Sequence, residues 1–391
     1  MRKIRILTCC VAAAIGLCGN AIIREMRPLQ PVEADSVVLY DFFWCNVQRE
    51  ADSMACESVR AWPWQPQTIT TDKLDRRVDA WKSSLEQMRL TGVPCDSLKK
   101  GEELFPMLKE TVELGMLTRE ARFFDVAERM LYNSVMRFWR FHVGWKEKNE
   151  TLIQLMRSVG SVAYASCGND IYINMLMRSN VHVKNEAVDF CMQILNSSPW
   201  YNDTSIRIVK DMSPIEAVAD TALSEFQRLI VHEESTDSVD LTFHIRIPSW
   251  TSGSDMLPGH TAQCKKQPVI IMVNGSLYTP EMVDGYAVVK GRWAVGDLIS
   301  IKMPTPILRI TEPNHPDMVA LQRGPIVYFT HFDYKKANAH LNLKDPISHF
   351  FNDKAQFIAL KTTNENKYGK LKGIHFPYYS FGADQIFVPA K

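Results

Sequence analysis

The chain has no marked excess of charge of either sign and no long apolar run beyond its first residues. Its 391 residues include 45 Lys and Arg against 44 Asp and Glu, for a formal net charge of +1. This balance gives no basic field to attract nucleic acid and no acidic tail. No stretch beyond the N-terminus reaches the ~18 apolar residues of a membrane-spanning helix. We therefore expect a globular protein of two or three domains, with neither a nucleic-acid partner nor a membrane span.

Cysteine and glycine motifs are also lacking. Outside the first 21 residues, the cysteines are scattered singly: Cys45, Cys56, Cys95, Cys167, Cys191 and Cys264. No CxxC pair occurs, which argues against a zinc knuckle. The glycines form neither GxGxxG nor a Walker motif, so nothing indicates a phosphate-binding loop. Export would permit disulfides, but we expect buried free thiols at most of these positions.

Residues 1–21 have the pattern of a secretory signal peptide. Three basic residues lie within the first five, an apolar stretch covers 6–17, and small residues follow at 19–21. The stretch is too short to span a membrane. It predicts export to the periplasm or the exterior. An amphipathic first helix and a lipidated cysteine are the alternatives, and the residues around the early cysteines fit lipidation poorly.

The next part of the chain divides into an irregular segment and a helical domain. Residues 22–67 show no regular period and end in the proline-rich AWPWQPQ at 61–67, a linker pinned by its tryptophans or a sugar-stacking platform. Over 68–166 the apolar spacing is helical. Helices are expected at 78–90, 104–118, 121–141 and 149–164. Their short connections favour antiparallel neighbours, as in an α/α-barrel or a fragment of one.

From residue 167 to residue 391 the apolar period changes to two. The expected strands are 171–179, 188–195, 205–209, 241–247, 269–275, 286–291, 297–303 and 326–330, with further alternation over 357–391. Short strands separated by turns predict an antiparallel β-sandwich. A helical pattern at 213–231 interrupts them. The fold class we expect is therefore multidomain α and β, with a partial α/α-barrel followed by an antiparallel β-sandwich.

A block within this region combines several specific motifs. It reads FHIRIPSW at 243–250, VNG at 273–275, GYAVVKGRWAVGDLISIKMP at 285–304 and VALQRGPIVY at 319–328. Asn274-Gly275 favours a tight hairpin turn, and Trp293 is expected to anchor the core. Three arginines could lie on the surface or face the helical domain: Arg292, Arg309 and Arg323.

This block resembles the β-sandwich module of glycoside hydrolase family 127, the β-L-arabinofuranosidase-like proteins. ARFFDVAERMLYN at 121–133 and residues 149–179 are similar to the family's helices and first sandwich strand, so the resemblance covers roughly residues 100–391. It implies a helical barrel braced by the sandwich. It also implies retaining hydrolysis by a cysteine thiolate, with a zinc ion held by that cysteine, two others and a glutamate. A second glutamate acts as general acid/base. Family members are much longer, so most N-terminal barrel helices are expected to be missing or replaced.

The family's catalytic motifs are a Glu-x-Cys and a tandem Cys-Cys shortly before an asparagine, and neither is present. With Asn149 aligned on that asparagine, the tandem cysteines fall near Trp145-Lys146. Glu102 can match the glutamate, but Leu104 replaces the cysteine. The resemblance therefore implies that the family's zinc is lost, and no other cofactor is expected.

Three functional hypotheses remain. The first is an exported family 127-like protein of carbohydrate metabolism that is catalytically impaired, a pseudoenzyme. The second is an active glycosidase on arabinose-containing glycans whose relocated carboxylates are Glu102 and Glu103, with Glu110 and Glu113 nearby. The third is a non-catalytic glycan-binding or interaction protein. Glutamates on a helix more often form its solvated face, and His142 is a weaker candidate.

Overall fold

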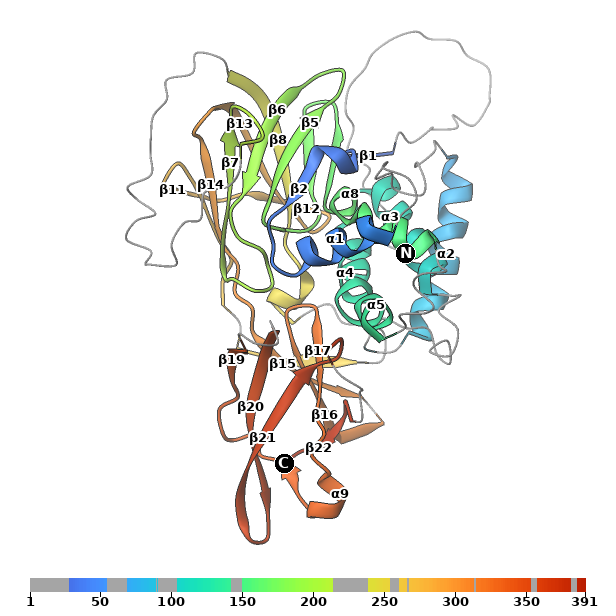
Figure 1. Cartoon of the computed structure of the whole chain (residues 1–391), viewed down its shortest axis with the longest axis vertical. Coiled ribbons are helices and arrows are strands. Elements are labelled where there is room, and N and C mark those ends of the chain that lie inside the picture. The colour runs from blue at the N-terminus through green and yellow to red at the C-terminus, as the bar shows by residue number, and fades with distance from the viewer. Residues whose placement is uncertain are drawn as a thin grey trace.

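The computed structural model describes residues 28–54, 69–88, 90, 104–141, 150–213, 238–253, 260–265, 267–312, 314–352, 357–380 and 385–391. Helices dominate the first half of this mixed α and β fold, and several β-sheets follow (Figure 1). The helices lie beside the first two sheets, and the C-terminal sheet extends away from both. No helix in the described ranges is long and apolar enough to cross a membrane.

The helical elements agree closely with the amphipathic pattern. They are α1 (Trp44–Met54), α2 (Thr71–Glu86), α3 (Leu104–Thr118), α4 (Ala121–Met130), α5 (Met136–Phe141), α7 (Glu150–Arg157) and α8 (Val159–Ala163). A π-helical turn, η3 (Leu131–Val135), joins α4 to α5, so the helix expected over 121–141 is continuous. Each helix turns its apolar side inward: α2, for example, buries Leu74, Val78 and Trp81.

The prediction that residues 22–67 are irregular is wrong for the part that the structure describes. This segment forms β1 (Gln30–Pro31), a short 3-10 turn η1 (Ala34–Ser36), β2 (Val37–Leu39) and α1. β1 pairs with the six-stranded sheet and β2 with the seven-stranded sheet, so the segment joins both. Strands of two and three residues are too short to show a period of two. The AWPWQPQ segment lies outside the described residues.

Two sheets form the first β-region. The six-stranded sheet has the order β1-β3-β4-β8-β13-β12, with β3 (Tyr164–Cys167), β4 (Asp170–Ile173), β8 (Ser238–Arg246), β12 (Glu281–Val283) and β13 (Tyr286–Ala294). The seven-stranded sheet has the order β11-β10-β14-β7-β6-β5-β2, with β5 (Ser179–Lys184), β6 (Asp189–Ile194), β7 (Asp203–Val209), β10 (Ile270–Val273), β11 (Ser276–Tyr278) and β14 (Leu298–Lys302). Phe190 of one sheet contacts Phe243 of the other, ring centroids 6.4 Å apart. The pairing is antiparallel except between β4 and β8.

A third, nine-stranded sheet follows. Its main path is β18-β20-β21-β17-β16-β15-β9, and β19 and β22 pair with β20 and β16. Its strands are β9 (Thr261–Gln263), β15 (Ile307–Glu312), β16 (His315–Arg323), β17 (Ile326–Phe329), β18 (His340–Leu341), β19 (Ser348–Asn352), β20 (Phe357–Asn366), β21 (Gly369–Pro377) and β22 (Val388–Pro389). Two short helical elements, η4 (Ser249–Thr251) and α9 (Tyr334–Ala337), lie among the connections. The region from residue 167 onward therefore contributes to three sheets, which is more than the two of a single β-sandwich.

Several details expected from the sequence are confirmed. Asn274 and Gly275 both have positive φ, 49° and 79°, as a tight hairpin requires. Trp293 is buried. Two of the arginines differ in exposure. Arg292 is exposed, whereas Arg323 is buried and donates to the Pro199 carbonyl at 2.9 Å. Of the pattern at 213–231, all but Ser213 lies outside the described residues.

One face of α4 docks the helices onto the β-regions. The buried Arg246 of β8 forms ion pairs with Asp125 and with Glu128, the latter at 2.8 Å. The indole of Trp250 donates to the same Glu128 carboxylate at 3.0 Å. Burial raises the pKa of Asp125 to about 6, while the positive charge of Arg246 opposes that rise. Because these charges are removed from water, their mutual pairing fixes how α4 meets the sheet.

The same helix face continues to the third sheet. Arg129 donates to the Gln322 side chain of β16 at 2.8 Å. Asn133, one turn later, donates to the Pro325 carbonyl at 2.8 Å and accepts from the Val327 amide at 2.9 Å. Four polar residues of ARFFDVAERMLYN are therefore docking residues placed at helical spacing: Asp125, Glu128, Arg129 and Asn133.

Candidate functional site

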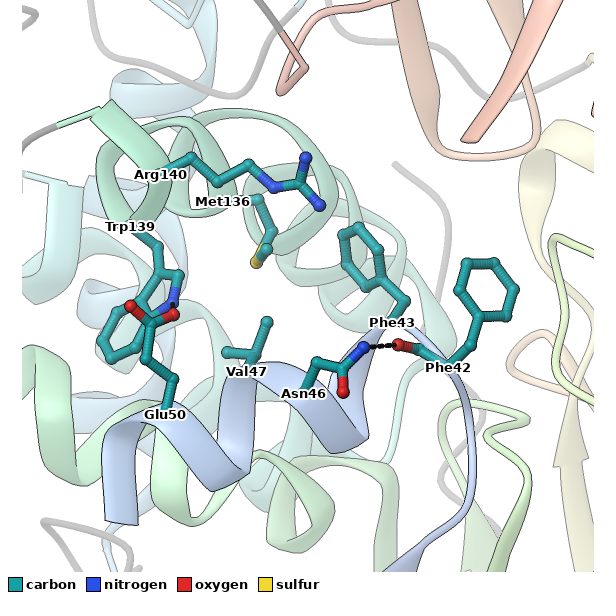
Figure 2. A pocket seen from close by; sticks show the side chains of 8 residues that line it. All are labelled: Phe42, Phe43, Asn46, Val47, Glu50, Met136, Trp139 and Arg140. Atoms are coloured by element: carbon teal, nitrogen blue, oxygen red, sulfur yellow. Dashed lines mark hydrogen bonds between the residues drawn. The ribbon is translucent and has the colours of Figure 1, made fainter. Parts of the chain in front are cut away.

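A small pocket lies between the first turns of α1 and the helix α5 (Figure 2). Its volume is about 130 Å³, and its lining residues are Phe42, Phe43, Asn46, Val47, Glu50, Met136, Trp139 and Arg140. An engineered cavity of ~150 Å³ binds a benzene ring. The pocket therefore has room for one ring-sized group.

The start of α1 is fixed by the Asp41 side chain. Its carboxylate accepts from the backbone amides of Phe43 and Trp44 at 2.7 and 2.9 Å. These bonds satisfy amides that the helix itself leaves unpaired. Burial raises the pKa of Asp41, while its hydrogen bonds oppose that rise. The cap thereby fixes the residue at which α1 begins, and so determines which of its side chains face α5.

Aromatic rings form the base of the pocket. The Phe43 ring stacks on Tyr132 of the π-helical turn, with centroids 5.6 Å apart and an interplanar angle of 19°. It also contacts Trp200 and Tyr379, which come from the seven-stranded sheet's connections and the C-terminal region. Three parts of the fold thus hold one ring in place, which makes the pocket wall rigid.

A carboxylate is held at one end of the pocket. Glu50 Oε2 accepts a hydrogen bond from the indole Nε1 of Trp139 at 2.7 Å. Trp139 is buried, whereas Glu50 is only partly buried and lines the cavity. The buried indole therefore orients a carboxylate that can accept hydrogen bonds from the hydroxyl groups of a ligand.

A guanidinium group lies at the other end. Arg140 Cζ is 5.0 Å from the ring centroid of Tyr379 and 5.8 Å from that of Phe43. Figure 2 shows this side chain across the pocket from Glu50. Within the described ranges, no carboxylate forms an ion pair with Arg140.

The remaining lining is mixed. Asn46 is exposed, and its Nδ2 donates to the Phe42 carbonyl at 2.7 Å, which orients the amide oxygen. Val47 and Met136 are buried and apolar. A few polar groups around an apolar, aromatic wall are typical of small-molecule pockets. This chemistry suits a compact polyhydroxylated ring with an apolar face.

Among the carboxylates proposed from the sequence, the described ones, Glu110 and Glu113, do not line this pocket. Glu102 and Glu103 lie outside the described residues, as do His142 and Trp145-Lys146. Glu110 and Glu113 both pair with Arg77 of α2, at 2.7 and 2.5 Å, and so connect α3 to α2.

Leu104, at the position where the resemblance puts a zinc-binding cysteine, begins α3 and is fully buried. In the part of the chain that the structure describes, no three His, Cys, Asp or Glu side chains are grouped to hold a metal ion. The described cysteines are Cys45, Cys167, Cys191 and Cys264, and no disulfide joins them to one another.

Sequence reasoning missed Glu50, Trp139 and Arg140. Glu50 and Trp139 are 89 residues apart, so no local pattern joins them. The available signal was DFFW at 41–44, an aspartate placed to cap a helix ahead of an aromatic cluster.

Solved glycoside hydrolases share this fold. A GH127 β-arabinofuranosidase aligns with a TM-score of 0.59 at 17% identity, over 73% of this chain and 49% of that chain. A GH127 β-L-arabinofuranosidase from Geobacillus stearothermophilus T6 gives 0.57 at 17% identity, over 78% and 55%. A third structure, a glycoside hydrolase, gives 0.52 at 14% identity, over 73% and 52%. The chain spans about half the length of these structures.

One segment of the sequence also matches a family model. Residues 170–305 match the family model described as β-L-arabinofuranosidase, GH127 middle domain. No curated protein matches the chain significantly. Residues 170–305 are thus similar to the GH127 middle domain and the fold is that of solved GH127 enzymes, which agrees with the resemblance read from the sequence.

Proposed function

We propose that the chain is a GH127-like protein of carbohydrate metabolism that binds a single sugar unit of an arabinose-type glycan between α1 and α5. The observation that carries this proposal is the placement of Glu50 and Arg140 at opposite ends of a pocket walled by Phe43. The carboxylate and the guanidinium match hydroxyl groups, and the ring matches the apolar face of a sugar.

The same pocket supports binding better than turnover. Retaining hydrolysis needs a nucleophile and a general acid/base on either side of the scissile bond. Among the described residues that line the pocket, Glu50 is the one carboxylate and none is a cysteine. Leu104 and Trp145-Lys146 stand where the resemblance puts the zinc-binding thiolates. Loss of a nucleophile costs several orders of magnitude in rate, so we propose that hydrolysis by the family mechanism is impaired.

Two broader features belong to this proposal. The antiparallel helices are interpreted as a partial α/α-barrel, since each buries one apolar side against its neighbours. Export is proposed from the signal-peptide pattern of residues 1–21. An exported protein would meet polymeric plant or microbial glycans, which agrees with a sugar-binding role.

Binding and turnover can be separated in one series of measurements. Titration of the whole protein with L-arabinose and arabino-oligosaccharides, followed by NMR, gives the affinity. Glu50→Gln keeps an oxygen for the Trp139 indole but removes the charge, and we expect it to weaken binding about tenfold, the effect of losing one charge-assisted hydrogen bond. The exposed Glu86→Gln on α2 is the matched control and should bind like the parent protein.

Hydrolysis of an aryl β-L-arabinofuranoside, with and without added zinc, is the second readout. We expect no turnover above the buffer in either case. Zinc-dependent turnover would overturn the impaired-catalysis part of the proposal. Absence of sugar binding, or equal binding by Glu50→Gln, would overturn the pocket assignment.

A further inference from the structure

We propose that the α1–α5 pocket selects a sugar that bears a carboxylate, such as a uronic acid, and that Arg140 binds the acid group. This inference rests on the proposed sugar-binding function and goes beyond it, because an arabinose unit carries no acid group. It concerns the end of the pocket opposite Glu50, where the guanidinium lies (Figure 2).

Arg140 is held by rings. Its Cζ lies over Tyr379 and Phe43, at 5.0 and 5.8 Å from the ring centroids. Aromatic faces attract a guanidinium through their quadrupole and leave its N–H edge free to donate. The side chain is thus positioned while most of its hydrogen-bonding capacity stays available, because Arg140 is exposed to solvent.

Neighbouring arginines show what a structural role looks like in this fold. Arg77 contacts two carboxylates, Glu110 and Glu113. Arg137, one turn before Arg140, donates to the Tyr378 carbonyl at 3.2 Å. Arg140 has no ion pair or hydrogen bond with any of the residues described here, apart from the two ring contacts. The Arg140 guanidinium presents several N–H donors at the edge of the pocket and has no acidic partner among the described residues. It can therefore bind a carboxylate through two parallel hydrogen bonds.

Glu50 sets the orientation of the ligand. Its carboxylate repels an acid group and accepts hydrogen bonds from hydroxyls, so the acid of the ligand faces Arg140 and its hydroxyls face Glu50. The 2.7 Å hydrogen bond from the Trp139 indole Nε1 to Glu50 Oε2 holds this carboxylate at the end of the pocket opposite Arg140. The volume of about 130 Å³ limits the bound unit to one ring.

The test compares acidic and neutral sugars on the whole protein. NMR titrations with galacturonate and glucuronate, against galactose and glucose, measure the preference. We expect the acids to bind at least tenfold more tightly, and added salt to weaken only the acids. Arg140→Gln should weaken binding of the acidic sugars far more than binding of the neutral ones and so abolish the preference, and Arg140→Lys should restore part of it. The exposed Arg76→Gln on α2 is the control and should keep the full preference.

The outcomes distinguish this inference from the proposed function. Equal affinity for acidic and neutral sugars would overturn the inference and leave sugar binding intact. A preference that persists in Arg140→Gln would overturn the role of Arg140. Failure of every sugar to bind would overturn both.

Discussion

At the scale of single residues, side chains far from each other in sequence decide the pocket. Asp41 begins α1, and that start places Glu50 opposite Trp139. Asp41 and Glu50 lie outside the resemblance, which covers roughly residues 100–391. Site chemistry of this kind follows from tertiary contacts, so only the structure brings it together.

A second residue, His375 on β21, gives the fold a predictable acid sensitivity. Its side chain is fully buried, both ring nitrogens lack a hydrogen-bond partner in the described structure, and burial lowers its pKa to about 4. The unfolded chain therefore binds this proton more readily than the folded one. The contribution of the neutral His375 ring to the free energy of unfolding is therefore fully present above pH ~6.5 and is lost as the pH falls towards 4.

The expected loss between pH 7.5 and pH 5 is about 2 kcal/mol from this histidine alone. His375→Leu should remove that part of the pH dependence, because leucine does not titrate. Urea unfolding at the two pH values measures it. His315→Leu, at an exposed position of β16, is the matched control and should keep the parent's pH dependence. An unchanged acid loss in His375→Leu would contradict the account.

At the scale of elements, α4 is the connection between helices and sheets. Arg246→Met leaves the Asp125 and Glu128 carboxylates buried without their shared cation. Removing one partner of a buried ion pair costs ~3–5 kcal/mol. We expect a loss of that size in the free energy of unfolding, measured by urea denaturation at pH 7.5.

Arg292→Met provides the comparison, since Arg292 lies on the neighbouring strand β13 and is exposed. Exposed substitutions usually change stability by less than ~0.5 kcal/mol. Equal losses in the two variants would show that the Asp125–Arg246–Glu128 cluster does not carry the junction.

The sequence predicted some elements well and others not at all, for physical reasons. The helices at 104–118 and 121–141 were found because each buries a stripe with a 3.6-residue period. The hairpin at Asn274-Gly275 was found because few residue pairs adopt two positive φ angles. β1 and β2 were missed because they are too short to alternate, and α1 because it follows them without a separate signal.

The division into three sheets was also beyond the pattern. Alternation shows that a segment is a strand, but it does not say which strands are neighbours. β4 and β8, for example, pair in parallel although about 65 residues separate them. The pocket also depended on contacts that alternation does not show, since its lining combines α1 with α5, and its Phe43 ring packs on Tyr132 and Tyr379.

At the scale of the whole molecule, helices and sheets share one core. A single buried cluster runs from Leu29 through the helices to Val388 in the last strand. Across the described helices, Phe141 is the one large apolar side chain that is exposed, so this half does not leave a wide apolar face open.

A shared core predicts cooperative unfolding. Far-UV circular dichroism and tryptophan fluorescence should report coincident urea transitions, since tryptophans lie both in helices, as Trp81, and in the sheets, as Trp293. Two resolved transitions, with the helices lost first, would show that the helices and sheets are energetically separate.

The measurement that tests the central claim most directly is a crystal structure of the protein soaked with a methyl arabinofuranoside and, separately, with galacturonate. The account predicts one sugar ring between α1 and α5, with hydroxyls within ~3 Å of Glu50 and, for galacturonate, the acid group on Arg140. An empty pocket at saturating ligand, or a sugar bound on the sheets instead, would contradict it.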